Sequence, residues 1–150
     1  MSNWTPHITV ATVVENNDGF LLVHETDNGK AVFNQPAGHW DEGESLLTAA
    51  ARETLEETGW RVTIDYLIGI YIYHSPHNHI TYQRLAFAGT PVEQLHQKYD
   101  EGIIDALWLP YSQILARQSE MRSPLVLKVI DDYRSGHQYP LDMIHELPRS

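Results

Sequence analysis

The expected fold of this chain follows mainly from two segments, Gly38-His-Trp-Asp-Glu-Gly-Glu44 and Arg52-Glu-Thr-Leu-Glu-Glu-Thr-Gly59. The segment that contains its second half, 46–58, is made of helix-forming residues and lacks both Pro and Gly. Gly59 stands where glycine commonly ends a helix, because it adopts the left-handed conformation easily. The sequence therefore predicts a helix over 46–58, preceded by a glycine-containing loop.

Three carboxylates share one side of this predicted helix. At about 100° per residue, Glu53, Glu56 and Glu57 fall within one arc. The opposite arc, expected to pack on a sheet, carries Leu47, Ala51, Thr54, Leu55 and Thr58. Two like charges about 4 Å apart repel by roughly 4 kcal/mol at an effective dielectric constant of about 20, and Arg52 alone cannot balance three of them. A solvated helix face is the ordinary explanation of such a cluster, whereas a bound Mg²⁺ would also neutralise it.

Strands are expected on both sides of the helix. Before it, runs rich in β-branched and aromatic residues span Ile8–Val14, Phe20–Val23 and Ala31–Asn34. After it, similar runs span Arg61–Asp65, Tyr66–Tyr73, Ile80–Ala88 and Ile103–Leu109, and two helices are expected over 110–116 and 124–134. This order predicts an α/β (α+β) fold with a mixed β-sheet sandwiched between helices, as a single domain over residues 1–150.

Composition narrows the possible partners. The 150 residues include 10 Lys and Arg against 20 Asp and Glu, a net charge of −10, which disfavours nonspecific nucleic-acid binding. Cysteine is absent, which excludes disulfides and cysteine zinc sites. No targeting signal is visible near the N-terminus, and the longest apolar stretch, 66–73, is too short to span a bilayer. We therefore expect a cytoplasmic protein that binds neither nucleic acid nor membrane.

The acidic segment resembles the signature of the Nudix hydrolase family, G-x5-E-x7-R-E-U-x-E-E-x-G-U, where U is a bulky aliphatic residue. All seven fixed positions match: Gly38, Glu44, Arg52, Glu53, Glu56, Glu57 and Gly59. Two aliphatic positions depart from the pattern, Thr54 and Trp60, and the Thr54 hydroxyl needs a partner on the packed side. Four further stretches are similar to a group of bacterial phosphatases within this family: 6–11, 34–39, 122–125 and 139–144.

The resemblance implies Mg²⁺-dependent hydrolysis of phosphoanhydride bonds, with Mn²⁺ able to substitute. The implied substrates are nucleoside tri- and diphosphates and related small pyrophosphates, including the thiamine-precursor pyrimidine pyrophosphate. The implied metal ligands are Gly38, through its carbonyl, and Glu53, Glu56 and Glu57. Arg52 and Glu44 would orient these ligands. The implied partner is a small-molecule nucleotide or pyrophosphate, bound by a monomer or homodimer.

Hydrolysis also needs a carboxylate that accepts a proton from water. The candidates within the signature are Glu53, Glu56 and Glu57, and those outside it are Asp100 and Glu101, of which Glu101 is expected to act. Gly102 would permit the turn that such a loop requires. The residues expected to bind substrate are Arg84, Gln35, Tyr73 and Trp40, although ordinary sheet packing also explains the aromatic ones.

Other functions stay open from the sequence. An ADP-ribose or nucleotide-sugar pyrophosphatase is one alternative, supported weakly by the position of Pro76. A non-catalytic nucleotide-binding module is another, but such modules often lose carboxylates that this chain retains. The spacing of His74, His77 and His79 permits a zinc site, although the sequence offers no evident fourth ligand.

Overall fold

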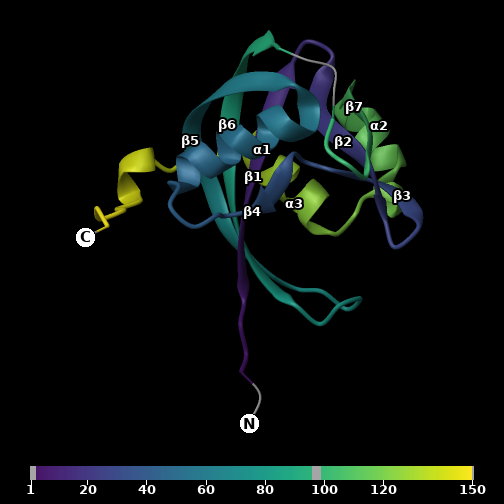
Figure 1. Cartoon of the computed structure of the whole chain (residues 1–150). Helices are drawn as coiled ribbons and strands as arrows, with labels where there is room; N and C mark the ends of the chain where they lie inside the picture. Colours follow the sequence, from purple (N-terminus) through teal and green to yellow (C-terminus); the bar gives the residue numbers. More distant parts are fainter. Residues whose placement is uncertain (1–2, 96–98, 150) are drawn as a thin grey trace.

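Seven strands form one mixed sheet in the computed structural model, which describes residues 3–95 and 99–149 (Figure 1). They are β1 (His7–Asn16), β2 (Gly19–Asp27), β3 (Lys30–Asn34), β4 (Ala37–His39), β5 (Trp60–His74), β6 (Thr81–Gln94) and β7 (Ile103–Leu109). The spatial order is β3-β2-β1-β6-β5, with β4 paired to β1 and β7 paired to β2. β1 and β6 run parallel, whereas the other strand pairs run antiparallel.

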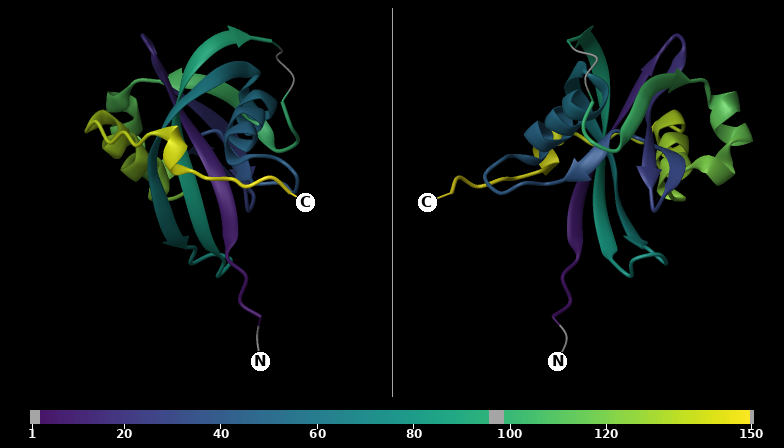
Figure 2. Two further views of the ribbon diagram at one scale, coloured as in Figure 1. Left: turned by 90° about the vertical axis from the view of Figure 1, so that its left-hand side faces the viewer. Right: turned by 45° about the vertical axis from the view of Figure 1, so that its right-hand side comes forward.

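Helices cover both faces of the sheet (Figure 2). The helices are α1 (Leu46–Thr58), α2 (Tyr111–Ala116) and α3 (Leu125–Arg134), with short 3₁₀ helices at Gln118–Glu120 and Leu141–Met143. α1 packs on one face against Leu67 and Phe87, and α3 packs on the other through Val126 and Ile130. Each such buried side chain contributes about 1.5–3 kcal/mol. The predicted fold class, a mixed sheet sandwiched between helices, is confirmed.

β1 and β2 pair with each other only near the turn that joins them. Their register pairs are Glu15 with Phe20 and Asn16 with Gly19, and beyond these the two strands diverge. The segment after β3 enters this gap, where the Thr12 N–H donates to the Pro36 carbonyl at 3.1 Å. β4 then pairs with β1 beneath α1. The divergence thus leaves a space beside the central strand, β1, and the candidate active site lies in this space.

α1 begins and ends where the sequence predicts. The Ser45 side chain accepts a hydrogen bond from the Thr48 N–H, and Gly59 closes the helix with a left-handed φ of 77°. The Thr54 hydroxyl, which needed a partner, donates to the Ala50 carbonyl within the same helix at 2.8 Å. The departure from the signature at this position is therefore compatible with a buried helix face.

Three strand predictions need correction. The two strands predicted over 61–65 and 66–73 form one strand, β5, because register shifts at three places absorb the local irregularities. β6 continues six residues past the predicted end at 88, and it tolerates Pro91 because its pairing with β1 ends at Gly89. β4 was missed, because Pro36 and Gly38 indicated a break, whereas pairing with β1 makes it a strand.

Within the described ranges, no helix combines the length and the apolar character that a membrane crossing requires.

Candidate active site

The face of α1 that packs on the sheet includes Thr54 and Thr58, as predicted, but it also extends to Glu53 and Glu57, which were expected on the opposite arc. Ala49 and Ala50 are fully buried against the sheet, whereas Leu55 is only partly buried. Glu53 and Glu57 follow these alanines at helical spacing and share their side, so both carboxylates are half-buried beside β4. Small alanine side chains let the helix approach closely, which a pattern based on the larger apolar residues did not reveal.

Arg52 organises the acidic side chains around it. Its guanidinium donates two hydrogen bonds to Glu44, at 2.9 and 2.7 Å, in a bidentate pair. The remaining nitrogen donates to Glu53 at 2.9 Å and to Glu56 at 3.1 Å. Hydrogen bonding to Glu44 raises the pKa of Arg52 above its usual value, so this side chain stays cationic. One arginine thus contacts four carboxylates, since Asp41 also lies 3.2 Å from it, and the orienting roles of Arg52 and Glu44 stay a prediction.

Each of the three predicted ligand carboxylates has one oxygen engaged with the protein. Glu53 and Glu56 each accept from Arg52, and one Glu57 oxygen accepts from the Ala37 N–H at 2.8 Å. The second oxygen of each carboxylate accepts no such bond from the described residues. In this arrangement no three acidic or histidine side chains of the described ranges converge on one point at metal-binding distance.

Gly38 brings backbone against one of these carboxylates. A Cβ atom at this position would overlap the Glu53 carboxyl group, so only glycine permits the close approach. The backbone at Gly38 therefore lies directly against the Glu53 carboxyl group. Oxygen atoms of carboxylates and backbone carbonyls are the ligands that Mg²⁺ and other hard cations prefer, so this set of residues fits a divalent cation.

The pKa values of two carboxyl groups are raised, mainly because burial disfavours their charged form. Burial raises the pKa of Glu57 from 4.5 to about 8, with further contributions from Glu25, Glu53 and Asp100. Burial also raises the pKa of Glu53, although its contact with Arg52 opposes the shift. A bound cation would lower both values, since an opposite charge favours the ionised form.

These shifts predict how stability depends on pH and on Mg²⁺. The folded protein holds a proton on Glu57 that the unfolded chain releases, so without metal the free energy of unfolding falls as pH rises from about 4.5 to about 8. Because Mg²⁺ binds the ionised carboxylate, the rise in Tm that it produces is expected to increase over the same range. Thermal unfolding with and without Mg²⁺ across this range measures the effect. A Mg²⁺ effect that is equal at both ends of the range would contradict it.

Substituting Gly38 by Ala is expected to weaken metal binding. The added methyl group displaces the Glu53 carboxylate, while the backbone conformation itself remains allowed. The half-saturating Mg²⁺ concentration is expected to rise about tenfold or more, the scale seen when a group that orients a metal ligand is lost. Calorimetric titration with Mg²⁺ measures this directly, and an unchanged affinity would show that the close approach is unimportant.

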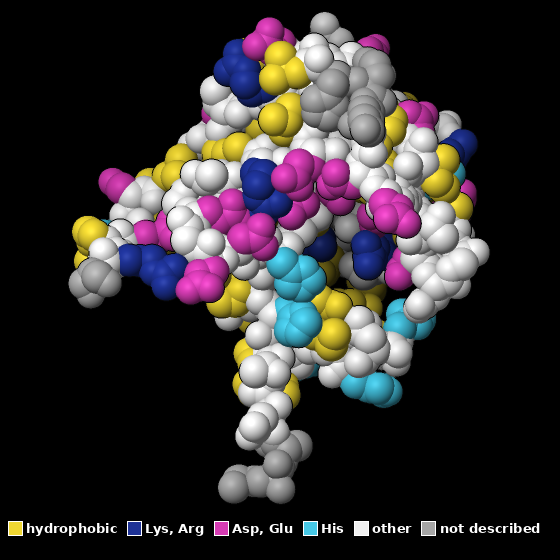
Figure 3. Space-filling model, viewed as in Figure 1, with side chains coloured by type: hydrophobic (Ala, Val, Ile, Leu, Met, Phe, Trp, Pro, Cys, Tyr) yellow, Lys and Arg dark blue, Asp and Glu magenta, His cyan; other side chains and the backbone are white. Residues whose placement is uncertain are grey.

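We call Glu53, Glu56 and Glu57 together the acidic ridge. A cleft of about 320 Å³ lies beside this ridge. Arg84 from β6 and Arg122 from the segment before α3 line it, together with Tyr73 and Tyr82. Figure 3 shows acidic side chains gathered above a hollow that holds basic ones, with histidine side chains at its edge. Negative charge on one side and positive charge on the other suit a metal-bound phosphate group, which is itself anionic.

Arg84 is a partly buried cation whose Nε atom is inaccessible, and it lacks a carboxylate partner among the described residues. One of its nitrogens donates to the Gln35 side chain at 3.3 Å, and Gln35 in turn donates to the Val126 carbonyl at 2.8 Å. Burial and the nearby charge of Arg122 lower the pKa of Arg84 to about 10, so it remains charged at neutral pH. The structure therefore places the predicted Arg84 in the cleft, with Gln35 fixing its orientation.

Arg122 and Glu25 belong to the site but were not predicted. The Arg122 guanidinium donates to Glu25 at 2.8 Å and lies 3.7 Å from Asp27, which braces it at the cleft. Glu25 is buried and also contributes to the raised pKa of Glu57. It thus lies between the basic and acidic sides of the site. The sequence marks Arg122 only as part of the stretch 122–125 that resembles the phosphatase group, and it does not mark Glu25, because β2 and the segment before α3 meet only in the fold.

The loop acid within reach of the acidic ridge is Asp100. Its charge contributes to the raised pKa values of both Glu53 and Glu57. Glu101, which the sequence favoured, is exposed, as Asp100 also is, and its charge is not among those that raise these two pKa values. The loop is held in place where the Thr26 N–H donates to the Gly102 carbonyl at 3.0 Å. The influence of Asp100 on both carboxyl groups favours it as the candidate base, and the choice between these two neighbouring acids stays a prediction.

Trp40 lies away from the cleft. Its indole N–H donates to the Glu44 carbonyl at 2.7 Å, and its ring lines a separate hollow beside the C-terminal segment. The turn formed by its own loop directs the side chain outward, so its position does not support the predicted contact with substrate. Tyr73 does line the cleft, as predicted, and His77 lies at the same cleft from the loop after β5.

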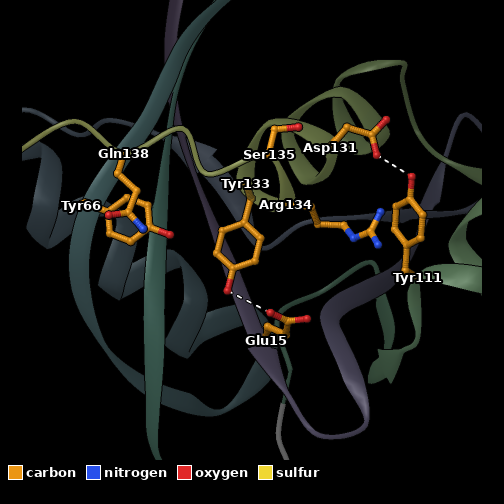
Figure 4. A pocket seen from close by; sticks show the side chains of 8 residues that line it. All are labelled: Glu15, Tyr66, Tyr111, Asp131, Tyr133, Arg134, Ser135 and Gln138. Carbon is orange, nitrogen blue, oxygen red and sulfur yellow. Dashed lines mark hydrogen bonds between the residues drawn. The ribbon is translucent and has the colours of Figure 1, made fainter.

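A further hollow of about 690 Å³ lies at the C-terminal end of α3 (Figure 4). Its polar side chains pair with one another: Tyr111 donates to Asp131 at 2.6 Å, and Tyr133 donates to Glu15 at 3.0 Å. Arg134 stacks 3.5 Å above the Tyr111 ring. Because these groups already satisfy each other, and the acidic ridge lies elsewhere, this hollow is not the active-site candidate.

The fold and the acidic ridge together define an enzyme of the Nudix class, and comparison with known proteins agrees. The profile of the NUDIX domain matches residues 5–129, so the chain belongs to the Nudix family. It is therefore a hydrolase that acts on phosphoanhydride bonds. A solved "NUDIX hydrolase from Nitrosomonas europaea" is 42% identical, with a TM-score of 0.92 over 95% of this chain and 98% of that one.

Within this family the chain is similar to phosphatase NudJ, a member of the phosphatase group that the sequence resembles. The NudJ proteins of Escherichia coli (strain K12) and Shigella boydii serotype 4 (strain Sb227) are each 43% identical over 141 residues. The match covers 93% of this chain and 90% of theirs. The NUDIX domain of Shewanella oneidensis NrtR, solved with ADP ribose, shares the fold at 19% identity, with a TM-score of 0.72 over 87% of this chain and 88% of that one.

Proposed function

We propose that the protein uses Mg²⁺ to hydrolyse phosphoanhydride bonds in nucleoside tri- and diphosphates and related small pyrophosphates. The observation that carries this proposal is the cleft itself, where the acidic ridge of α1 lies opposite Arg84 and Arg122. A metal ion on one side and two guanidinium groups on the other suit the charge of a pyrophosphate. The similarity to phosphatase NudJ supports the same substrate class.

Each group of residues in the site would have a distinct role. Glu53, Glu56, Glu57 and the Gly38 carbonyl would hold Mg²⁺, which when bound lowers the pKa of water and neutralises phosphate charge. Arg84 and Arg122 would bind the phosphate oxygens from the opposite wall. Arg52 keeps the carboxylates in place, and Asp100 would accept the proton of the attacking water.

A release assay over a panel of substrates tests this proposal. The panel contains nucleoside tri- and diphosphates, the pyrimidine pyrophosphate, ADP-ribose and a nucleotide sugar. We expect release of phosphate or pyrophosphate from the first two groups with Mg²⁺, and none after chelation. Absence of turnover throughout would overturn the proposal. A clear preference for ADP-ribose or the nucleotide sugar would instead support the pyrophosphatase alternative.

A further inference from the structure

Three buried side-chain atoms in the described part of the chain have no hydrogen-bond partner. They are the Thr9 hydroxyl oxygen, the Asn34 side-chain oxygen and the Nε atom of Arg84. All three residues line the cleft beside the acidic ridge. Proteins rarely leave buried polar atoms without a hydrogen-bond partner. Three such atoms around one cleft therefore indicate that a bound ligand supplies the missing hydrogen bonds.

Their positions follow from the sheet. Thr9 lies on β1 directly beside Arg84 in the β1–β6 register, so both side chains stand on the same face. Asn34 ends β3, on the far side of the gap that β1 and β2 leave as they diverge. Thr9 and Asn34 therefore approach the cleft from strands that do not pair with each other.

The chemistry of these groups differs from that of the phosphate-binding groups. Arg84 is cationic and suits an anion, whereas Thr9 and Asn34 are neutral and can each donate and accept a hydrogen bond. Neutral groups of this kind suit the edge of a nitrogen heterocycle, where a donor lies next to an acceptor. Tyr73 and Tyr82 line the same cleft and offer faces on which a planar ring can stack.

We propose that Asn34 and Thr9 read the base of the substrate, so that the enzyme favours pyrophosphates that carry a nitrogen heterocycle over those that carry none. Asn34 pairs with the donor and acceptor on one edge of the ring, as asparagine does with nucleic-acid bases. Thr9 supplies a further hydrogen bond beside the phosphate-binding Arg84. This inference rests on the proposed function, and it identifies the residues that select the substrate.

Binding of a matched pair of inert ligands tests the inference without turnover. The first ligands are the α,β-methylene analogues of ADP, GDP, CDP and UDP, and the second is methylenediphosphonate, which has the same phosphonate groups and no nucleoside. Calorimetry with Mg²⁺ measures the ratio of their dissociation constants. We expect the wild-type protein to bind at least one nucleoside analogue more tightly than methylenediphosphonate. This preference should fall about tenfold or more in Asn34→Leu and in Thr9→Val, since the heterocycle then lacks its partner.

Thr12→Val is the matched control. Thr12 lies buried on the same strand, but outside the cleft, and its hydroxyl contacts the Ala50 carbonyl at 3.4 Å. This variant should keep the full preference for the nucleoside analogue. Asn34→Leu and Thr9→Val preserve side-chain shape and remove unpaired atoms, so their Tm values without ligand should equal or exceed the wild-type value.

Two results would overturn the inference. One is a wild-type protein that binds no nucleoside analogue more tightly than methylenediphosphonate, or variants that keep the wild-type preference. The other is a lower Tm in both Asn34→Leu and Thr9→Val, which would assign these side chains to the stability of the fold. Because the test measures binding, it remains decisive even if the release assay finds no turnover, which would bear on the proposed function alone.

Discussion

Replacing Glu57 by Gln is expected to lower kcat at saturating Mg²⁺ by about 10²-fold or more, the scale of losing a major electrostatic contribution. The amide keeps the size of the side chain, and its oxygen can still accept from the Ala37 N–H. The loop before α1 should therefore stay in place while one ligand charge is lost. Steady-state kinetics with Mg²⁺ titration, together with the Tm of the variant, measure the two effects separately.

Glu93→Gln is the control for this experiment. Glu93 is an exposed acid on β6 that pairs with Arg61 at 2.9 Å, outside the cleft. Its substitution removes the same charge from the protein and should leave kcat unchanged. Near-wild-type turnover of Glu57→Gln would mean that the acidic ridge does not hold the metal.

Asp100→Asn is expected to lower kcat by about 10²-fold or more as well, with little change in KM or in Mg²⁺ affinity. General bases contribute about 10²–10⁴-fold, and a loss in kcat alone is typical of a contact made mainly in the transition state. Asp100 is the loop acid whose charge reaches Glu53 and Glu57. The carboxylates of the ridge would be occupied by metal, which makes them poorer proton acceptors.

Glu101→Gln is the matched variant, since it removes an acid from the next position of the same loop. We expect it to keep nearly full activity. A loss of kcat in Glu101→Gln alone would return the role to the residue that the sequence favoured. If neither substitution slows turnover, the base is one of the carboxylates on α1.

Local signals in the sequence predict the elements of the fold that depend on neighbouring residues. Ser45 and Gly59 set the ends of α1, and the turn residues between β1 and β2 mark a hairpin. β4 and the full length of β5 were not predictable in this way. They depend on pairing with strands far away in the sequence, which tolerates Gly38 and bulges that locally indicate a break.

The spacing of the acidic residues predicts the ridge, but not the direction in which it faces. Thr54 and Thr58 are buried on the predicted packed side, but Ala49 and Ala50 are buried as deeply, whereas Leu47 and Leu55 are only partly buried. Packing on a sheet depends on how closely two backbones can approach, which side-chain hydrophobicity does not describe. As a result, the Glu53 and Glu57 carboxylates are half-buried, and their pKa values rise.

Most residues of the basic wall of the cleft were not predicted from the sequence as site residues. Arg84 was identified from its charge, but Arg122 and Glu25 form a pair 97 residues apart. Thr9 and Asn34 lie in two of the stretches that resemble the phosphatase group, but nothing in those stretches assigns them a role. They become notable because the fold buries their polar atoms beside the cleft without a partner.

A crystal structure with Mn²⁺ and methylenediphosphonate, with the metal located by its anomalous scattering, tests the central claim most directly. Our interpretation predicts a Mn²⁺ peak within about 2.0–2.4 Å of oxygens from Glu53, Glu56, Glu57 or Gly38. The phosphonate groups should lie between that peak and the guanidinium groups of Arg84 and Arg122. A peak at the histidines of the 74–79 loop instead, or phosphonate bound outside the cleft, would contradict it.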